Sequence, residues 1–452
     1  MSTESVAAEP RLSTPIKDNP RTIFGWCMYD WANSAYITTA VGLIPLYFAN
    51  VVVGREGVTI RGTHYHPDSL WGLMVGVADV LAFLAAPVLG AIADFSAAKK
   101  RFLLMFAYTG SLFTLLLYFS RSGDLYRTML FFVVAQFCYV SANVFYDAFL
   151  PQIASEQRMD WVSGKGYSFG YVGGGLQFAI ALGLIVGHGR LGIAQETAAR
   201  VGIGMAGLWW AGFTLFTAKL LWEAPAGERL PEAYRRWPRP LALAAMGLER
   251  TWATTRRVRR FRHLVLFLLA FMFYNDGIQT VINLATTYGS VEMRLPTAVL
   301  MGTLLAIQFV ATLGALLFSW IAGRLGTKRS IMLTLVLWSG VVIYAYFMTN
   351  ATQFFVLGII VGIVLGGSQA LSRSFFGSMV PEQASAEFYG FYTVFTKFSA
   401  VWGPFAFALM KQWTGSSRQA IVSLIAFFLV GMTLLQFVNE TKAREAREAG
   451  AF

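Results

Sequence analysis

The sequence predicts an all-α polytopic membrane protein with twelve transmembrane helices arranged as two six-helix halves. Of its 452 residues, 56% are hydrophobic and only 13% are charged, about half the charged share of roughly 25% in soluble domains. A soluble protein of this length needs more polar residues to cover its surface, so soluble enzymes and disordered proteins are excluded. Long unbroken apolar runs favour helices over a β-barrel, because only these two structures satisfy every backbone polar group in lipid.

Twelve apolar spans follow from a window of about 20 residues, the length of helix that crosses the hydrocarbon core. They are expected at 24–53, 69–93, 102–120, 126–150, 164–188, 200–222, 263–289, 297–322, 330–349, 352–376, 387–412 and 417–437. One long polar connection in the middle predicts two repeated halves. The domains are then an N-terminal tail 1–23, a first half 24–222, a central loop 223–262, a second half 263–437 and a C-terminal tail 438–452.

The net charge of +12 is expected to report membrane topology. With both termini on the cytoplasmic side, 24 lysine and arginine residues lie on that side and 9 on the other. This asymmetry follows the positive-inside rule, predicts an inner cell membrane protein with cytoplasmic termini, and removes nucleic acid as a partner. The arginine-rich segment 250–262 also carries Trp252 and Phe261. It suits either a helix lying on anionic headgroups or a solvated basic linker.

A motif follows the second span and recurs in degenerate form after the eighth. Its first copy comprises Gly90, Asp94, Lys99, Lys100 and Arg101. Lys328 and Arg329 repeat the basic pair 229 residues later, which supports two repeated halves.

At these residues the chain resembles the major facilitator superfamily. The stretches 29–36 and 164–176, one rich in aromatic residues and the other in glycine, are more specifically similar to the branch related to the autophagy-linked vacuolar amino-acid effluxer. The resemblance implies a compact, bacterial-type secondary transporter. In the fungal members it implies release of neutral amino acids from the vacuole. It also implies that Asp94 and the basic residues form a latch on the inner face.

Charged residues inside the spans are functional candidates, because each costs at least about 2.5–3.5 kcal/mol on insertion scales. They are Asp30, Asp79, Asp147, Asp276, Arg373 and Lys397. In the seventh span, Asp276, Gln279, Thr280 and Asn283 share one helical face. Such a stripe is expected to line a central cavity, although hydrogen bonding between helices is the alternative. The expected substrate cavity is formed by Asn33, Ser34, Asp276, Gln279, Asn283, Gln369 and Trp402.

Asp30 and Asp276 are the candidates for proton coupling. Each half opens with an acid beside a tyrosine. A carboxyl group in a cavity that switches access can take up a proton on one side and release it on the other. The alternative is that either acid is a fixed member of an ion pair that positions helices.

The expected gating residues are the motif residues together with Asp147, Arg373 and Lys397. Asp147 has two possible uses: local pairing with Lys99 to Arg101 beside Asp94, which we favour, or a bridge between halves to Arg373 or Lys397. Asp79 is expected either in the cavity or in helix packing. Trp402, followed by a glycine and a proline, predicts a break in the eleventh span.

The predicted function is secondary active transport, by alternating access, of a small polar or zwitterionic organic solute such as an amino acid, coupled to a proton or sodium ion. No phosphate-binding glycine loop, catalytic constellation or metal motif stands in the sequence. An enzyme is therefore not expected, nor is a cofactor or metal, and the expected working unit is a monomer. The alternatives are a receptor or scaffold that has lost transport and a carrier of a lipid or lipid-linked substrate.

Overall fold

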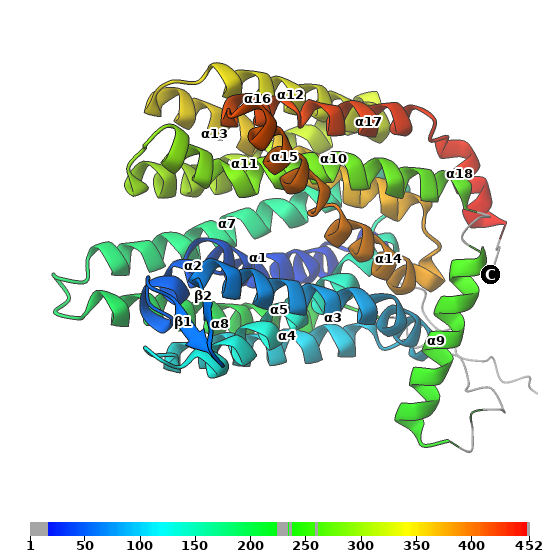
Figure 1. The fold of residues 1–452 in the computed structure, drawn as a ribbon. Helices are drawn as coiled ribbons and strands as arrows, with labels where there is room; N and C mark the ends of the chain where they lie inside the picture. The colour runs from blue at the N-terminus through cyan, green and yellow to red at the C-terminus, as the bar shows by residue number, and fades with distance from the viewer. Residues whose placement is uncertain (1–16, 224–233, 235–236, 258–260, 450–452) are drawn as a thin grey trace, which may run out of the picture.

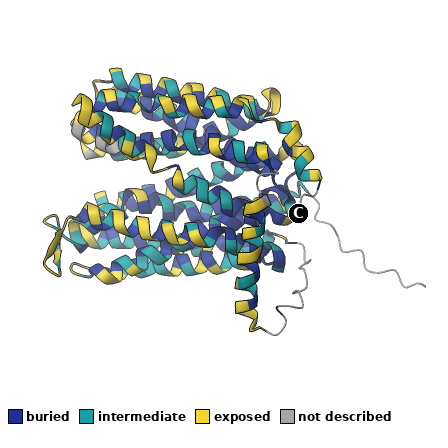
Figure 2. Ribbon diagram, turned by 45° about the vertical axis from the view of Figure 1, so that its right-hand side comes forward, coloured by how far each residue is buried: buried dark blue, intermediate teal, exposed yellow. Residues whose placement is uncertain are grey.

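The computed structural model describes residues 17–223, 234, 237–257 and 261–449, and long helices make up nearly all of it (Figure 1). The helices form two bundles that lie side by side. Figure 2 shows buried residues concentrated inside the bundles and exposed residues along the outer faces. This distribution is the one expected of bundles whose outer surface meets lipid.

The first bundle is built from the first six spans. Its elements are α1 (Pro20–Gly42), α2 (Ile44–Tyr47), η1 (Phe48–Val52), β1 (Val58–Ile60), β2 (Thr63–Tyr65), α3 (Pro67–Ser96), α4 (Lys99–Leu116), η2 (Leu117–Phe119), α5 (Leu125–Ala148), α6 (Leu150–Ile153), η3 (Glu156–Arg158), α7 (Met159–Val186) and α8 (Gln195–Leu220). Strands β1 and β2 pair antiparallel in a short hairpin, with Val58 opposite Tyr65.

The second bundle is built from the last six spans and follows a connecting helix, α9 (Arg239–Arg257). Its elements are α10 (Arg262–Thr287), η6 (Tyr288–Glu292), α11 (Thr297–Leu325), α12 (Thr327–Phe347), α13 (Ala351–Met379), η7 (Glu382–Ala384), α14 (Ser385–Phe398), α15 (Trp402–Thr414), α16 (Ser417–Val422) and α17 (Ile425–Gln436); a final helix, α18 (Glu440–Glu448), lies beyond them.

The predicted count of spans is confirmed. In the described part of the chain, eleven helices are long and apolar enough to cross a membrane, and a twelfth span is the pair formed by α1 and the helix after it, which bends by 41°. The bend lies at Leu43, two residues before Pro45, whose ring cannot fit a regular helix interior. The eleventh span is broken between α14 and α15, as the sequence predicts.

The two bundles touch through helix pairs α7 with α11 and α3 with α14. The second pair packs closely because Gly90 has no side chain. A Cβ atom at this position would lie only 2.2 Å from the carbonyl oxygen of Ala386. The motif glycine is therefore needed for contact between the halves.

The central connection contains a helix where the sequence suggested a loop. Helix α9 crosses the end of the first bundle (Figure 1) and packs on α3 through Ala242 and Met246. Its opposite face exposes Leu248 and Trp252. Residues 250–257 of the arginine-rich segment are thus helical, and their contact with headgroups stays a prediction, whereas Arg259 and Arg260 lie outside the described residues.

Both ends of the described chain lie at one end of the molecule, which we call the terminal end. Asp18 donates its backbone N–H to Ile153, and Arg447 of α18 donates to the carbonyl of Ser378. The hairpin β1–β2 lies at the opposite end.

Candidate functional site

A cavity of about 510 Å³ lies between the two bundles. It extends from the middle of the molecule toward the opposite end, where Tyr288, Leu300 and Met348 line it. Its polar lining in the middle comes from both halves: Asp30, Ser34, Thr38, Asp79, Gln279, Asn283, Gln369 and Lys397. Four of the expected cavity residues, Ser34, Gln279, Asn283 and Gln369, therefore do line it.

Three expected cavity residues lie elsewhere. Asn33 is buried and donates from Nδ2 to Oδ1 of Asn143, 2.7 Å away on α5. The side chain of Trp402 is 55% exposed on the outer surface. Asp276 is buried against a helix of its own half and does not reach the cavity.

Asp276 caps the helix that starts after the break in the eleventh span. Its carboxylate accepts the backbone N–H groups of Gly403 at 2.8 Å and Trp402 at 3.1 Å. Such N–H groups at a helix start have no partner within the helix, and a negative charge there also meets the positive end of the helix dipole. A Cβ atom at Gly403 would lie 2.0 Å from Oγ1 of Thr280, so only glycine fits. Asp276 thus stabilises the broken span.

Asp79 and Lys397 form an ion pair across the cavity. The Lys397 Nζ atom of α14 lies 2.8 Å from Oδ1 of Asp79 on α3. Both side chains line the cavity and are about one quarter exposed. Asp79 is therefore a cavity residue, and the suggested pairing of Lys397 with Asp147 is wrong.

Arg373 crosses from the second half into the first. Its side chain is 2% exposed, and Nη1 lies 3.1 Å from Oδ1 of Asp147 and 3.7 Å from Oδ2 of Asp30. Nε and Nη2 donate to the hydroxyl and carbonyl oxygens of Ser163. The favoured local pairing of Asp147 with Lys99 to Arg101 is therefore wrong, because the bridge between halves satisfies this carboxylate.

Three aromatic rings complete the surroundings of Arg373. Its guanidinium carbon lies 4.0 Å from the ring centre of Tyr167, 4.8 Å from that of Trp26 and 5.3 Å from that of Tyr146. The sequence gives no direct prediction of these three rings around Arg373. An indirect signal is the row of small residues Ser163, Gly166 and Gly170 on one face of α7, which leaves room for a large side chain from the other half. A Cβ at Gly166 would lie 2.9 Å from Arg373 Nη2.

The motif after the second span forms the predicted contact at the terminal end. Asp94 pairs with Lys99 at 2.8 Å and accepts the backbone N–H groups of Ala386 and Glu387 at the start of α14. Lys99 also donates to Ser385 Oγ at 2.9 Å. One acid of the first half therefore caps a helix of the second half.

The other two basic residues of the motif do not cross between halves. Lys100 donates to the carbonyl of Leu221 at 2.5 Å, and Glu223 accepts the backbone N–H groups of Lys99 and Lys100. Burial raises the pKa of Glu223, and these two hydrogen bonds oppose that rise. The side chain of Arg101 is exposed.

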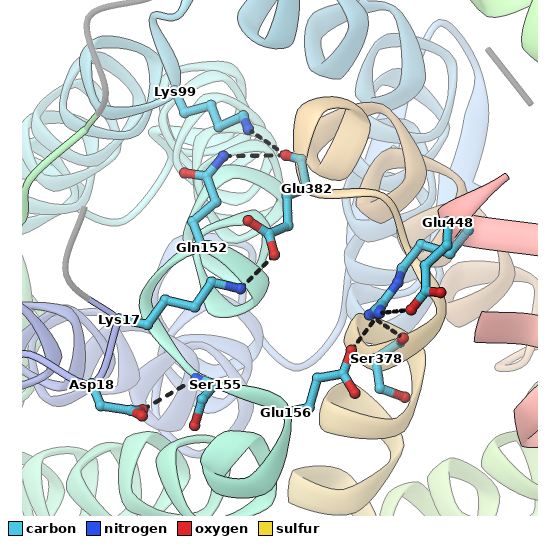
Figure 3. A network of polar contacts seen from close by, with 10 residues as sticks. Lys17, Asp18, Lys99, Gln152, Ser155, Glu156, Ser378, Glu382 and Glu448 are labelled. Carbon is cyan, nitrogen blue, oxygen red and sulfur yellow. Dashed lines mark hydrogen bonds and ion pairs between the residues drawn. The ribbon is translucent and has the colours of Figure 1, made fainter. Parts of the chain in front are cut away.

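Further polar contacts close the terminal end (Figure 3). Lys17 pairs with Glu382, whose carbonyl also accepts from Gln152 at 3.3 Å. Arg447 of α18 pairs with Glu156 and donates to the carbonyl of Ser378. The cavity is thus sealed at the end where the chain's two described ends lie.

Known proteins are similar to this chain in sequence over nearly its whole length. The profile of a family described as "Vacuole effluxer Atg22 like" matches residues 18–448. The MFS-type transporter YxiO of Bacillus subtilis, described as uncharacterized, is 33% identical over 94% of this chain and 96% of its own length. Autophagy-related protein 22 of Kluyveromyces lactis is 26% identical over 99% of both chains.

Solved structures show the same fold at low sequence identity. The proton:xylose symporter XylE is 12% identical, with a TM-score of 0.69, and the match covers 95% of this chain and 99% of that one. The human organic anion transporter MFSD10 is 15% identical, with a TM-score of 0.65 over 93% and 100% of the two chains. These likenesses place the twelve helices in the major facilitator fold.

Proposed function

We propose that this chain, which belongs to the Atg22-like branch of the major facilitator superfamily, moves a small polar or zwitterionic organic solute, such as an amino acid, by alternating access. The family consists of membrane transporters and not of enzymes. The observation that carries the proposal is a cavity between the halves that is sealed at one end and lined by charges of both signs.

Alternating access is supported by the way in which the terminal end is closed. Each closing contact joins one half to the other: Asp94 to the start of α14, Arg373 to Asp147, and Lys17 to Glu382. Two rigid bundles that rock against one another would break these contacts together and open the cavity at this end. The basic excess at the terminal end supports a cytoplasmic location of both termini in a cell membrane, so the described state would face outward.

The nature of the solute is supported by a separation of charge. Asp30 and Asp79 reach the cavity from the first half, whereas Lys397 reaches it from the second. A zwitterion can place its ammonium group on Asp30 and its carboxylate on Lys397, and so take the place of Asp79. It would then hold the two halves together by charge-assisted hydrogen bonds. The printed description of the family as effluxers supports movement of the solute out of a compartment.

Transport into proteoliposomes tests this solute class. We expect uptake of labelled neutral amino acids. In Lys397→Gln we expect a KM at least about tenfold higher, because the solute carboxylate loses one charge-assisted hydrogen bond. Lys411→Gln is the matched control, because this lysine lies in α15 outside the cavity lining. Transport of a neutral sugar without any zwitterion would contradict the solute class. Binding without transport of any solute would favour a receptor, and lipid movement between leaflets would favour a lipid carrier.

Asp30 is the proposed site of proton coupling. It lines the cavity and lies near, but not in hydrogen-bond contact with, the Arg373 guanidinium. In Asp30→Asn we expect loss of uptake driven by an imposed pH gradient. Exchange of solute across the membrane should persist at solute concentrations high enough to offset the weaker binding of the ammonium group. Asp276→Asn is the matched control, because the Asp276 carboxylate accepts backbone N–H groups of its own half and does not line the cavity. If Asp30→Asn takes up solute at the normal rate under a pH gradient, Asp30 is not the coupling residue. If uptake requires a sodium gradient instead, the coupling ion is sodium and not the proton.

A single chain forms the whole cavity, so we propose that the monomer is the working unit. The proposed partners are the solute, the coupling ion and the lipid bilayer.

A further inference from the structure

The surroundings of Arg373 form a receptor for a cation within one half of the molecule. Trp26 and Asp30 come from α1, Tyr146 and Asp147 from α5, and Ser163 and Tyr167 from α7. All six residues belong to the first half, whereas Arg373 belongs to the second. We call these six residues the cation cage.

The cage offers only groups that attract a positive charge. It contains two carboxylates, one backbone carbonyl that accepts from Arg373 at 2.8 Å, and three ring faces within 5.3 Å of the guanidinium carbon. Aromatic faces around a cation attract it more strongly once water is removed. The indole of Trp26 is held within the first half by a 2.7 Å hydrogen bond to the carbonyl of Tyr146 and stacks on the Tyr146 ring, so Arg373 is not needed to hold these two rings together.

The cage cannot remain empty at low cost. When the halves part at the terminal end, Arg373 moves with α13, and the two acids stay with the first half. Unpaired charges inside a membrane protein are expensive, and removal of one partner from a buried pair leaves the other uncompensated. The two carboxylates then need a proton, water or another cation in place of Arg373, and a cationic group of the solute can serve as that cation.

The cavity delivers such a cation directly. Asp30 and Tyr167 belong to the cage and also line the cavity. A solute whose ammonium group rests on Asp30 needs only to move inward to meet the other ring faces. We propose that the cation cage is a second binding site for the ammonium group of the transported solute, occupied by Arg373 when the terminal end is closed and by the solute when it is open. This inference rests on the proposed function in naming the solute.

The exchange gives the solute a physical means of opening the gate. The solute ammonium and the Arg373 guanidinium compete for the same two carboxylates. A ligand shifts an equilibrium only by its different affinity for the two states. The cage supplies that difference, because it admits the solute only when Arg373 is out.

The test measures binding to a vacated cage, without any transport. In purified full-length Arg373→Ala, we titrate ethylammonium and methylguanidinium and follow tryptophan fluorescence. Trp26→Phe in the same background identifies the part of the signal that comes from the cage. We expect saturable binding of both cations and none of methylurea, which is neutral. Tyr167→Leu should weaken binding about tenfold, as expected for loss of a desolvated ring face, whereas Tyr167→Phe should retain it.

Lys397→Ala is the matched control. It removes the partner of Asp79, whose side chain is about one quarter exposed in the cavity. We expect weaker binding of ethylammonium there than in the cage, because fewer groups surround the cation. Equal binding to Lys397→Ala and Arg373→Ala would overturn the proposal, as would binding of methylguanidinium without ethylammonium, because the cage would then fit only an arginine.

A second measurement covers the case in which Arg373→Ala does not fold. A cysteine at Ala370, which is fully buried where α13 meets Ser163 of α7, reports opening of the terminal end by maleimide labelling. In a chain that also carries Cys27→Ala and Cys138→Ala, which remove the two native thiols, ethylammonium should increase the labelling rate several-fold and methylurea should not. An unchanged rate would contradict the proposal. If ethylammonium binds the cage but amino acids are not transported, the cation site is supported and the proposed solute is wrong.

Discussion

The first spans of the two halves carry the same sequence signal and use it differently. Asp30 in α1 and Asp276 in α10 are both buried acids close to a tyrosine. Asp30 faces the cavity and a cation of the other half, the Arg373 guanidinium at 3.7 Å. Asp276 instead accepts two backbone N–H groups of its own half, at 2.8 and 3.1 Å.

This difference shows that the location of the partner decides the role of an acid in the membrane. A contact within one half persists when the halves rock, and therefore contributes to stability in every state. A contact between halves must break during the cycle, and therefore sets the balance between states. The same rule separates Lys100, which stays within the first half, from Lys99, which reaches Ser385.

The largest expected effect comes from Arg373→Met, which leaves two acids of the first half without their partner. Loss of one member of a buried pair costs about 3–5 kcal/mol. This cost falls only on the closed state, because the contact exists only there. We expect the terminal end to open, with strong maleimide labelling in the Ala370→Cys background and loss of solute transport. A labelling rate as low as in the native chain would show that Arg373 does not hold the gate.

Asp276→Ala should have an effect of similar size, but it should act on stability and not on the balance between states. Each hydrogen bond to a charged group contributes about 1.5–3 kcal/mol, and this substitution removes two. We expect the midpoint of thermal unfolding in detergent to fall by several degrees, while the folded protein keeps its coupling to the pH gradient. Asp30→Asn should show the reverse, with the midpoint kept and coupling lost. If both variants lose thermal stability, or both lose coupling to the pH gradient, the two acids do not have the different roles inferred here.

Asp94→Asn should shift the balance between states more moderately. The substitution removes the charge that pairs with Lys99 and caps α14, but it keeps an oxygen that can accept a hydrogen bond. A loss of about 1–2 kcal/mol corresponds to a change of roughly tenfold in the equilibrium. We expect labelling at Ala370 to rise by about that factor. Lys100→Gln is the control, and an equal rise there would show that the contact between halves is not the cause.

The spans and the charged positions could be predicted because lipid imposes both. An apolar run of sufficient length must be a helix, and a charge within it stands out against that background. The break in the eleventh span was also visible, since Gly403 and the proline after it interrupt the run. These features depend on local sequence alone.

Pairing could not be predicted, because it depends on the rotation of helices that are far apart in sequence. The sequence favours basic residues of the same half as partners of Asp147 and offers Arg373 only as an alternative, whereas the structure pairs Asp147 with Arg373, 226 residues away. The stripe on α10 shows the same limit. At about 100° per residue, Gln279 and Thr280 lie on opposite edges of the stripe, so Gln279 faces the cavity and Thr280 faces α15 with Asp276.

The smallest expected effect comes from Glu382→Gln, which removes a contact between halves that is also exposed. The paired side chains of Lys17 and Glu382 are 36% and 44% exposed. Exposed ion pairs contribute at most about 1 kcal/mol and are weakened by salt. The carbonyl of Glu382 keeps its hydrogen bond from Gln152 in the variant. We therefore expect labelling at Ala370 to rise by no more than about fivefold at low salt and by less in about 1 M salt, because salt weakens exposed ion pairs. A rise as large as that of Asp94→Asn, or one that does not change with salt, would mean that the effect depends only on crossing between the halves and that burial does not contribute.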